Sequence, residues 1–171
     1  MKNFSLNHYE RAFGNWLIDN KIQFIEVDEH KRAAFGGFKI KSFDYMLYPP
    51  NQKPIIAEVK GRKFAGSSVK GFSGFQNWVS LDDIAGLSEW QRVLGSDYMA
   101  AFVFVYRFSG VNLSLDEFDV YEYNGEPYCF FCVRLGDYCR EMTVRSPRWK
   151  TVFLPVESFK KYAVRPGRIF A

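Results

Sequence analysis

The sequence of 171 residues predicts a single α/β domain in which helices flank a mixed β-sheet. Three observations predict this class. Apolar residues recur at helical spacing in segments 5–20 and 80–95, and short runs rich in β-branched and aromatic residues predict strands between and after them. The composition, 47% hydrophobic and 19% aromatic, is that of a chain with a packed core. We expect one domain over residues 1–171, with its core at about 5–106 and an elaboration at about 107–171.

The first helix is expected over residues 5–20, with Ser5 as its N-cap. Glu10 falls at the edge of the apolar face, beside Leu17, so we expect its carboxylate to lean toward the sheet. The apolar face itself consists of Leu6, Tyr9, Phe13, Trp16 and Leu17.

Three strands are expected next, at residues 22–27, 42–48 and 54–60. The polar segment 28–41 between the first two contains glycines and is expected to be a loop or a hairpin. Prolines around Asn51 predict a turn between the second and third strands.

The hairpin formed by these last two strands brings acidic and basic residues together. If it is symmetric about Asn51, Met46 pairs with Ile56 and Asp44 lies opposite Glu58, whereas a bulge would shift that register by one residue. Lys60 lies one pleat repeat, ~6.8 Å, beyond Glu58 on the same face. The sequence therefore predicts an Asp–Glu–Lys cluster at the end of the hairpin.

The rest of the chain continues the α/β pattern. Segment 61–78 is rich in glycine, serine, basic and aromatic residues and is expected to be a long loop. A helix over 80–95 follows, capped by Ser80 and ended by Gly95, with the polar side chain of Gln91 in its apolar face. The later elements are a strand at 99–108, a hairpin around Asn124-Gly125, a strand at 149–155 and a helix at 156–164.

Charge is distributed unevenly along the chain. The formal net charge of +4 is the balance of four blocks: −2 over residues 1–30, +7 over 31–70, −7 over 71–139 and +6 over 140–171. Asp44 and Glu58 are the two acids within the +7 block. Two carboxylates in a cationic stretch are expected where an enzyme holds a metal and receives a polyanion, although a solvated basic surface has the same composition.

Several other functional classes receive little support. Cys129 and Cys132 have zinc-knuckle spacing but lie three apart in a predicted strand, so they should point to opposite faces as core cysteines. His8 and His30 have no serine or cysteine partner at a recognisable spacing, and no phosphate-loop motif occurs. The sequence contains no long apolar run and no signal-peptide core at its start, so we expect a soluble, cytoplasmic protein without membrane contact.

The order helix, strand, strand, strand, helix, strand, with an acid on the second strand and ExK on the third, resembles the PD-(D/E)xK nuclease superfamily. That superfamily includes restriction-type endonucleases and archaeal Holliday-junction resolvases. The matching residues are Glu10, Asp44, Glu58 and Lys60, and the likeness covers roughly residues 5–106. The segments HYERAFGNWL, RAAFGGFKIKSFDYMLY and AEVKGRKF also resemble a bacterial group of nuclease-like proteins in the superfamily. Lys41-Ser42-Phe43 stands where a proline often precedes the first acid.

The resemblance implies a restriction endonuclease-like fold: a mixed β-sheet flanked by helices with an αβββαβ core, here extended by a C-terminal β-hairpin and helix. It also implies a nuclease that uses Mg²⁺ or Mn²⁺. Asp44, Glu58 and the Val59 carbonyl would be metal ligands, because hard cations prefer oxygen. Lys60 would orient water or stabilise charge on the phosphate. Glu10 would complete the ligand set through water or hold a second metal; the alternative is a salt bridge.

Two further groups of residues complete the predicted site. In the resembling family a polar residue on the helix after ExK often points into the site, so Gln91 is a candidate for that role; the alternative is a hydrogen bond to the backbone. Lys41, Arg62, Lys63 and Lys70 are candidates for nucleic-acid contacts.

The expected partner is nucleic acid, most of all DNA. The resemblance also suggests a homodimer, because junction cutters act as symmetric dimers. The alternative functions are a catalytically silent nucleic-acid-binding module with the same fold and a structural protein whose hairpin acids pair with neighbouring lysines.

Overall fold

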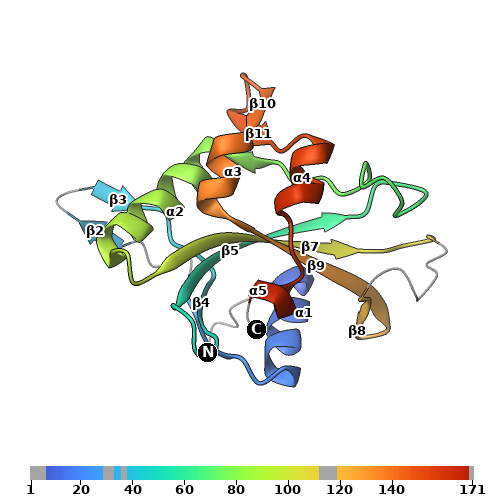
Figure 1. Cartoon of the computed structure of the whole chain (residues 1–171), viewed down its shortest axis with the longest axis horizontal. Coiled ribbons are helices and arrows are strands. Elements are labelled where there is room, and N and C mark those ends of the chain that lie inside the picture. Colours follow the sequence, from blue (N-terminus) through green and yellow to red (C-terminus); the bar gives the residue numbers. More distant parts are fainter. Residues whose placement is uncertain (1–6, 29–32, 36–37, 112–118, 170–171) are drawn as a thin grey trace.

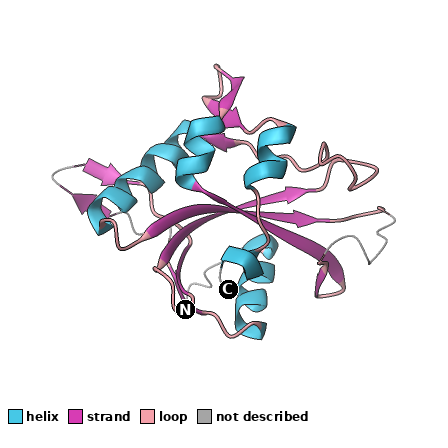
Figure 2. Ribbon diagram, viewed as in Figure 1, coloured by secondary structure: helices cyan, strands magenta, loops and turns pink. Residues whose placement is uncertain are grey.

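The computed structural model is built around a six-stranded mixed sheet with helices on both faces (Figures 1 and 2). It describes residues 7–28, 33–35, 38–111 and 119–169. The strand order is β1-β4-β5-β7-β9-β8, with β5 and β7 parallel and the other neighbours antiparallel. These strands are β1 (Gln23–Glu26), β4 (Tyr45–Tyr48), β5 (Ile55–Lys63), β7 (Met99–Arg107), β8 (Tyr121–Tyr123) and β9 (Glu126–Arg134).

The helices divide between the two faces of this sheet (Figure 1). The helices are α1 (His8–Asp19), α2 (Leu81–Leu94), α3 (Leu135–Glu141), α4 (Val156–Tyr162) and α5 (Pro166–Ile169). Residues of α2, α3 and α4 belong to one hydrophobic core with Phe102 and Phe104. Residues of α1 and α5 belong to the other core, with Val103 and Val105. The predicted αβββαβ order is therefore α1-β1-β4-β5-α2-β7.

Two small sheets lie outside the central one. β6 (Val79–Ser80), β10 (Thr143–Ser146) and β11 (Thr151–Phe153) form a three-stranded sheet in the order β10-β11-β6. β2 (Ala33–Phe35) and β3 (Phe38–Ile40) form a hairpin within the segment expected to be a loop or a hairpin. No helix in the described part of the chain has the length and apolar character needed to cross a membrane.

The start of α1 differs from the prediction. The N-cap is Asn7, whose side chain accepts hydrogen bonds from the N–H groups of Tyr9 and Glu10, each at 3.0 Å. Capping at Ser5 is therefore wrong, and Ser5 itself lies outside the described residues. The Asn7 carboxamide binds two of the first free N–H groups of the helix, which is why the helix begins at His8.

Strand β5 is longer than expected because β7 offers it nine consecutive partners, from Ile55↔Met99 to Lys63↔Arg107. The segment Gly61-Arg62-Lys63, expected to open a loop, is therefore strand. Gly61 allows α1 to pack closely on β5, since a Cβ at this position would lie 2.3 Å from ring carbons of Tyr9. The register Met46↔Ile56 is confirmed, and the pairing of β4 with β5 ends at Tyr45↔Ala57.

The C-terminal part confirms some predictions and adds elements. The hairpin β8–β9 turns at Asn124 and Gly125, whose φ angles are 50° and 76°. Cys129 and Cys132 lie in the cores on opposite sides of the sheet, so the prediction of core cysteines is confirmed. Helix α3 and strand β10 were not predicted, because each is too short for its periodicity to be visible in the sequence.

Candidate functional site

Asp44 lies immediately before β4, where the hairpin with β5 opens. Its N–H donates to the carbonyl of Ala57 at 3.0 Å, and its Oδ2 accepts a hydrogen bond from the N–H of Val59 at 2.6 Å. Burial, followed by the negative charge of Glu58, raises the pKa of this carboxyl well above 3.8. Among the described residues, Asp44 has no ion-pair partner and no hydrogen-bond donor other than Val59. A carboxylate in this position stabilises a cation that approaches it.

Glu58 is buried on β5 and binds two lysines through a single oxygen. Its Oε1 lies 2.9 Å from Nζ of Lys60 and 3.2 Å from Nζ of Lys41. The described residues donate no hydrogen bond to Oε2. Glu58 and Asp44 thus each have one oxygen bound by the protein and one available to a ligand.

Asp83, in the first turn of α2, completes a ring of alternating charges. Its Oδ1 binds Nζ of Lys60 at 3.0 Å and also contacts Nζ of Lys41. Its Oδ2 accepts from the N–H of Ser80 at 2.9 Å, within a capping box. Burial alone would raise the pKa of Asp83, but Lys60, Lys41 and the Ser80 N–H outweigh it and lower the pKa to about 2.

Sequence reasoning missed this role of Asp83. An acid in the first turn of a helix is explained by its favourable interaction with the helix dipole, so the helix pattern gave no reason to assign Asp83 to the site. The signal that could have located it is the strand order: the helix after β5 starts at the sheet end where Lys60 lies. Lys41, predicted to contact nucleic acid, joins the same ring, and these two carboxylates raise its pKa despite the opposing effect of burial.

The carbonyl of Val59 lies on the same edge of β5 as Asp44. The N–H and C=O of one strand residue point toward the same neighbouring strand, and the N–H of Val59 points to Asp44. Since pairing with β4 ends at Ala57, no strand of the described residues pairs with this carbonyl on that edge. The donors present at the end of the hairpin are therefore two carboxylate oxygens and one backbone carbonyl, a set that suits a hard divalent cation.

Glu10 approaches this group from the opposite face of the sheet. It is buried on α1, its Oε1 accepts from Nδ2 of Asn7 at 2.5 Å, and its backbone carbonyl accepts from the hydroxyl of Tyr45 at 2.9 Å. Its charge contributes to the raised pKa of Asp44. Nevertheless, no three Asp, Glu, His or Cys side chains in the described ranges form a group that could hold a metal ion. Glu10 is close to the carboxylate pair without belonging to a preformed triad.

Gln91 lies away from the cluster. It is eight residues beyond Asp83, ~12 Å along the helix axis, and its Nε2 donates to the carbonyl of Tyr98 at 3.3 Å. This is the backbone-bonding alternative stated above. The residue that α2 contributes to the cluster is Asp83.

The predicted nucleic-acid contacts do not share one environment. Lys63 and Lys70 are exposed on β5 and in the following loop. Arg62 is half-buried: its guanidinium donates to the carbonyls of Gly61 at 2.9 Å and Trp78 at 2.7 Å and lies 4.0 Å from the centre of the Trp78 ring. Arg145 contacts the same ring at 4.9 Å. Phe64 and Phe75 of the loop are core residues.

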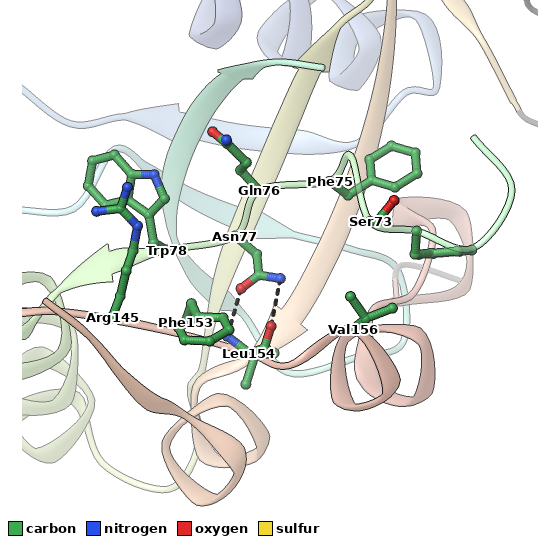
Figure 3. Close-up of a pocket in the computed structure, with 10 residues that line it drawn as sticks. Ser73, Phe75, Gln76, Asn77, Trp78, Arg145, Phe153, Leu154 and Val156 are labelled. Atoms are coloured by element: carbon green, nitrogen blue, oxygen red, sulfur yellow. Dashed lines mark hydrogen bonds between the residues drawn. The ribbon is translucent and has the colours of Figure 1, made fainter. Parts of the chain in front are cut away.

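A pocket of about 260 Å³ opens beside Trp78 and Arg145 (Figure 3). Asn77 anchors its wall: the Asn77 side chain accepts from the N–H of Leu154 at 2.7 Å and donates to the carbonyl of Leu154 at 3.2 Å. The two hydrogen bonds join the loop before β6 to the chain after β11 (Figure 3).

Comparison with known proteins identifies the fold. No family model matches the sequence, and no curated protein matches it. The structure is similar to that of Hjc, a Holliday junction resolvase from the archaeal hyperthermophile Archaeoglobus fulgidus, with a TM-score of 0.54. The match covers 95% of this chain and 98% of that chain at 13% sequence identity. Together with the αβββαβ core, it identifies a restriction endonuclease-like fold, as the sequence predicted.

Proposed function

We propose that this protein is a metal-dependent nuclease that hydrolyses DNA at the end of the β4–β5 hairpin. The observation that carries the proposal is the pairing of two carboxylates, Asp44 and Glu58, each with an oxygen that the described residues leave available, beside the ammonium of Lys60. The similarity to Hjc supports it, since that protein is a Holliday junction resolvase with the same fold.

In this proposal Asp44, Glu58 and the Val59 carbonyl hold Mg²⁺ or Mn²⁺, and Glu10 acts through a bound water. The ion would neutralise phosphate charge and lower the pKa of its water. Lys60 sits beside Glu58 at 2.9 Å, where its ammonium can orient a water or stabilise charge on the phosphate. Lys41, Lys63 and Lys70 supply cations for the DNA backbone.

The test is calorimetric titration of Mg²⁺ and Mn²⁺ into the parent and Glu58→Gln, with cleavage of labelled DNA by both proteins. We expect the parent to bind metal and to cut, and Glu58→Gln to lose both activities while its circular dichroism spectrum remains that of the folded parent. Cleavage by Glu58→Gln at the parent rate would show that the proposed site is wrong.

A second function is favoured by one observation. Glu58 is already bound by Lys41 and Lys60, an arrangement that also suits a catalytically silent nucleic-acid-binding module. A parent protein that binds DNA with strong salt dependence, but neither binds metal nor cuts, would establish this function instead.

Asp83 is expected to position Lys60 for the reaction. Asp83→Asn keeps an oxygen for the Ser80 N–H but removes the charge that holds Lys60 at 3.0 Å, so we expect cleavage to fall about 10- to 100-fold. The loss should appear in kcat, with metal affinity little changed.

Asp82→Asn is the matched control, because Asp82 is an exposed acid in the same helical turn. Equal losses in the two variants would assign the effect to helix charge rather than to Lys60.

A further inference from the structure

The hairpin formed by β10 and β11 lies at the edge of the molecule (Figure 1). Its turn contains an exposed tryptophan between two cations. Trp149 is 68% exposed, more than any other large hydrophobic side chain in the described part of the chain. Arg148 precedes it and Lys150 follows it. The Arg148 guanidinium lies 5.2 Å from the centre of the Trp149 ring, and most of the indole surface remains open to solvent.

The tip of this hairpin is held in place by hydrogen bonds. The N–H of Lys150 donates to the carbonyl of Pro147 at 3.3 Å, and the N–H of Trp149 donates to the hydroxyl of Ser146 at 3.2 Å. Arg148 and Trp149 are therefore the central residues of a tight turn, and both side chains are directed outward. A preformed tip loses little entropy when a ligand binds it.

The hairpin is joined to the proposed active site at two points. The N–H of Leu81, the first residue of α2, donates to the carbonyl of Lys150 at 2.8 Å, and Asp83 follows two residues later. At a bulge in β10, Arg145 lies over the ring of Trp78. The guanidinium of Arg62 also packs over the Trp78 ring, and Arg62 lies one pleat repeat beyond Lys60 on β5.

The chemistry of this surface is cationic and apolar. Residues 142–156 contain three cations, Arg145, Arg148 and Lys150, and no acid. Two further exposed apolar side chains belong to the segments that meet here: Val144 on β10, 62% exposed, and Leu81, whose N–H binds the Lys150 carbonyl, 43% exposed. A polyanion with exposed flat apolar groups fits both properties, and unpaired nucleotides have this chemistry. In a duplex the bases are stacked inside and only phosphates would be met.

We propose that this surface, defined by Arg145, Arg148, Trp149 and Lys150, binds an unpaired strand of nucleic acid beside the active site. Trp149 stacks on a base, and the three cations contact phosphates. The inference rests on the proposed function, because it names the substrate of that site as nucleic acid in which a single strand adjoins a duplex.

The experiment measures fluorescence anisotropy of labelled DNA in the presence of EDTA, so that binding is read without metal or cleavage. The probes are a blunt duplex and a duplex of equal length with a single-stranded extension. We expect Trp149→Ala to weaken binding of the extended probe about tenfold and to leave blunt-duplex binding unchanged. Trp149→Phe should restore most of the affinity. The double variant Arg148→Ala/Lys150→Ala should weaken both probes and reduce the salt slope by about 2.

The control is Ile18→Ala, which removes an exposed apolar side chain, 62% exposed, from α1 on the other face of the sheet. Equal affinities of Trp149→Ala and the parent for the extended probe would overturn the proposal. Equal losses on both probes, or no binding of either probe by the parent, would overturn it too. Trp149-dependent binding in a protein that neither binds metal nor cuts would uphold this inference while the proposed nuclease function fails.

Discussion

Asp44→Asn is expected to abolish metal binding and to lower DNA cleavage by a factor of at least ~10³, while making the metal-free protein more stable. The cause of both effects is the same carboxylate, which is partly buried, next to Glu58, and has no ion-pair partner among the described residues. Asparagine keeps an oxygen for the N–H of Val59 and removes the charge. We expect a gain of about 1–2 kcal/mol in the free energy of unfolding in EDTA at neutral pH.

The pH dependence of this gain follows from the sign of the pKa shift. In the folded protein the pKa of Asp44 lies above its ordinary value of 3.8. The stability that this group contributes is therefore fully present below pH 3.8 and is lost as pH rises through the folded-state pKa. Urea unfolding of parent and variant across this range should show a difference that grows with pH. Metal affinity of the parent should fall as pH is lowered through the same range, because protons compete with the ion.

The outcome that would contradict this account is loss of stability in Asp44→Asn without metal, or metal affinity equal to that of the parent. Asp97→Asn, an exposed change before β7, serves as the control for removal of a negative charge. It should change neither property.

Gly61→Ala is expected to destabilise the protein by about 1–3 kcal/mol. A Cβ at Gly61 would lie 2.3 Å from ring atoms of Tyr9, so the ring, the helix or the strand must move. α1 also carries Glu10, and β5 carries Glu58 and Lys60. We therefore expect cleavage to fall together with stability.

A double-mutant cycle separates this clash from a backbone effect. In a Tyr9→Gly background, Gly61→Ala should cost much less, because both the ring and the Cβ that meet the added methyl, at 2.3 and 2.6 Å, are gone. Gly136→Ala in α3 is the matched control, since a Cβ there meets no atom of the described residues within 4 Å. A cost in the Tyr9→Gly background equal to that in the parent would show that the Tyr9 side chain is not responsible. Urea unfolding measures each variant.

The sequence allowed the hairpin register and the convergence of Asp44, Glu58 and Lys60 to be predicted, because turn residues and strand periodicity are local signals. It did not reveal that Asp83 joins Lys60, because that contact depends on where α2 starts relative to β5. The same reason applies to Gln91. The helix pattern predicted which face of the helix Gln91 occupies, but not how far it lies from the end of the sheet. The strand predicted at 149–155 contains β11, but the hairpin at Trp149 was missed because β10 has four residues, too few for a visible alternation.

The charges of the ring formed by Lys41, Glu58, Lys60 and Asp83 determine how metal and DNA affect each other's binding. The two ammonium groups cancel the two carboxylates, so ionised Asp44 and nearby Glu10 leave the site with two negative charges. Such a site repels a phosphate diester. One divalent cation cancels this charge, and the repulsion of the phosphate is then removed. Metal and DNA should accordingly bind with positive coupling, each raising the affinity for the other by the same factor.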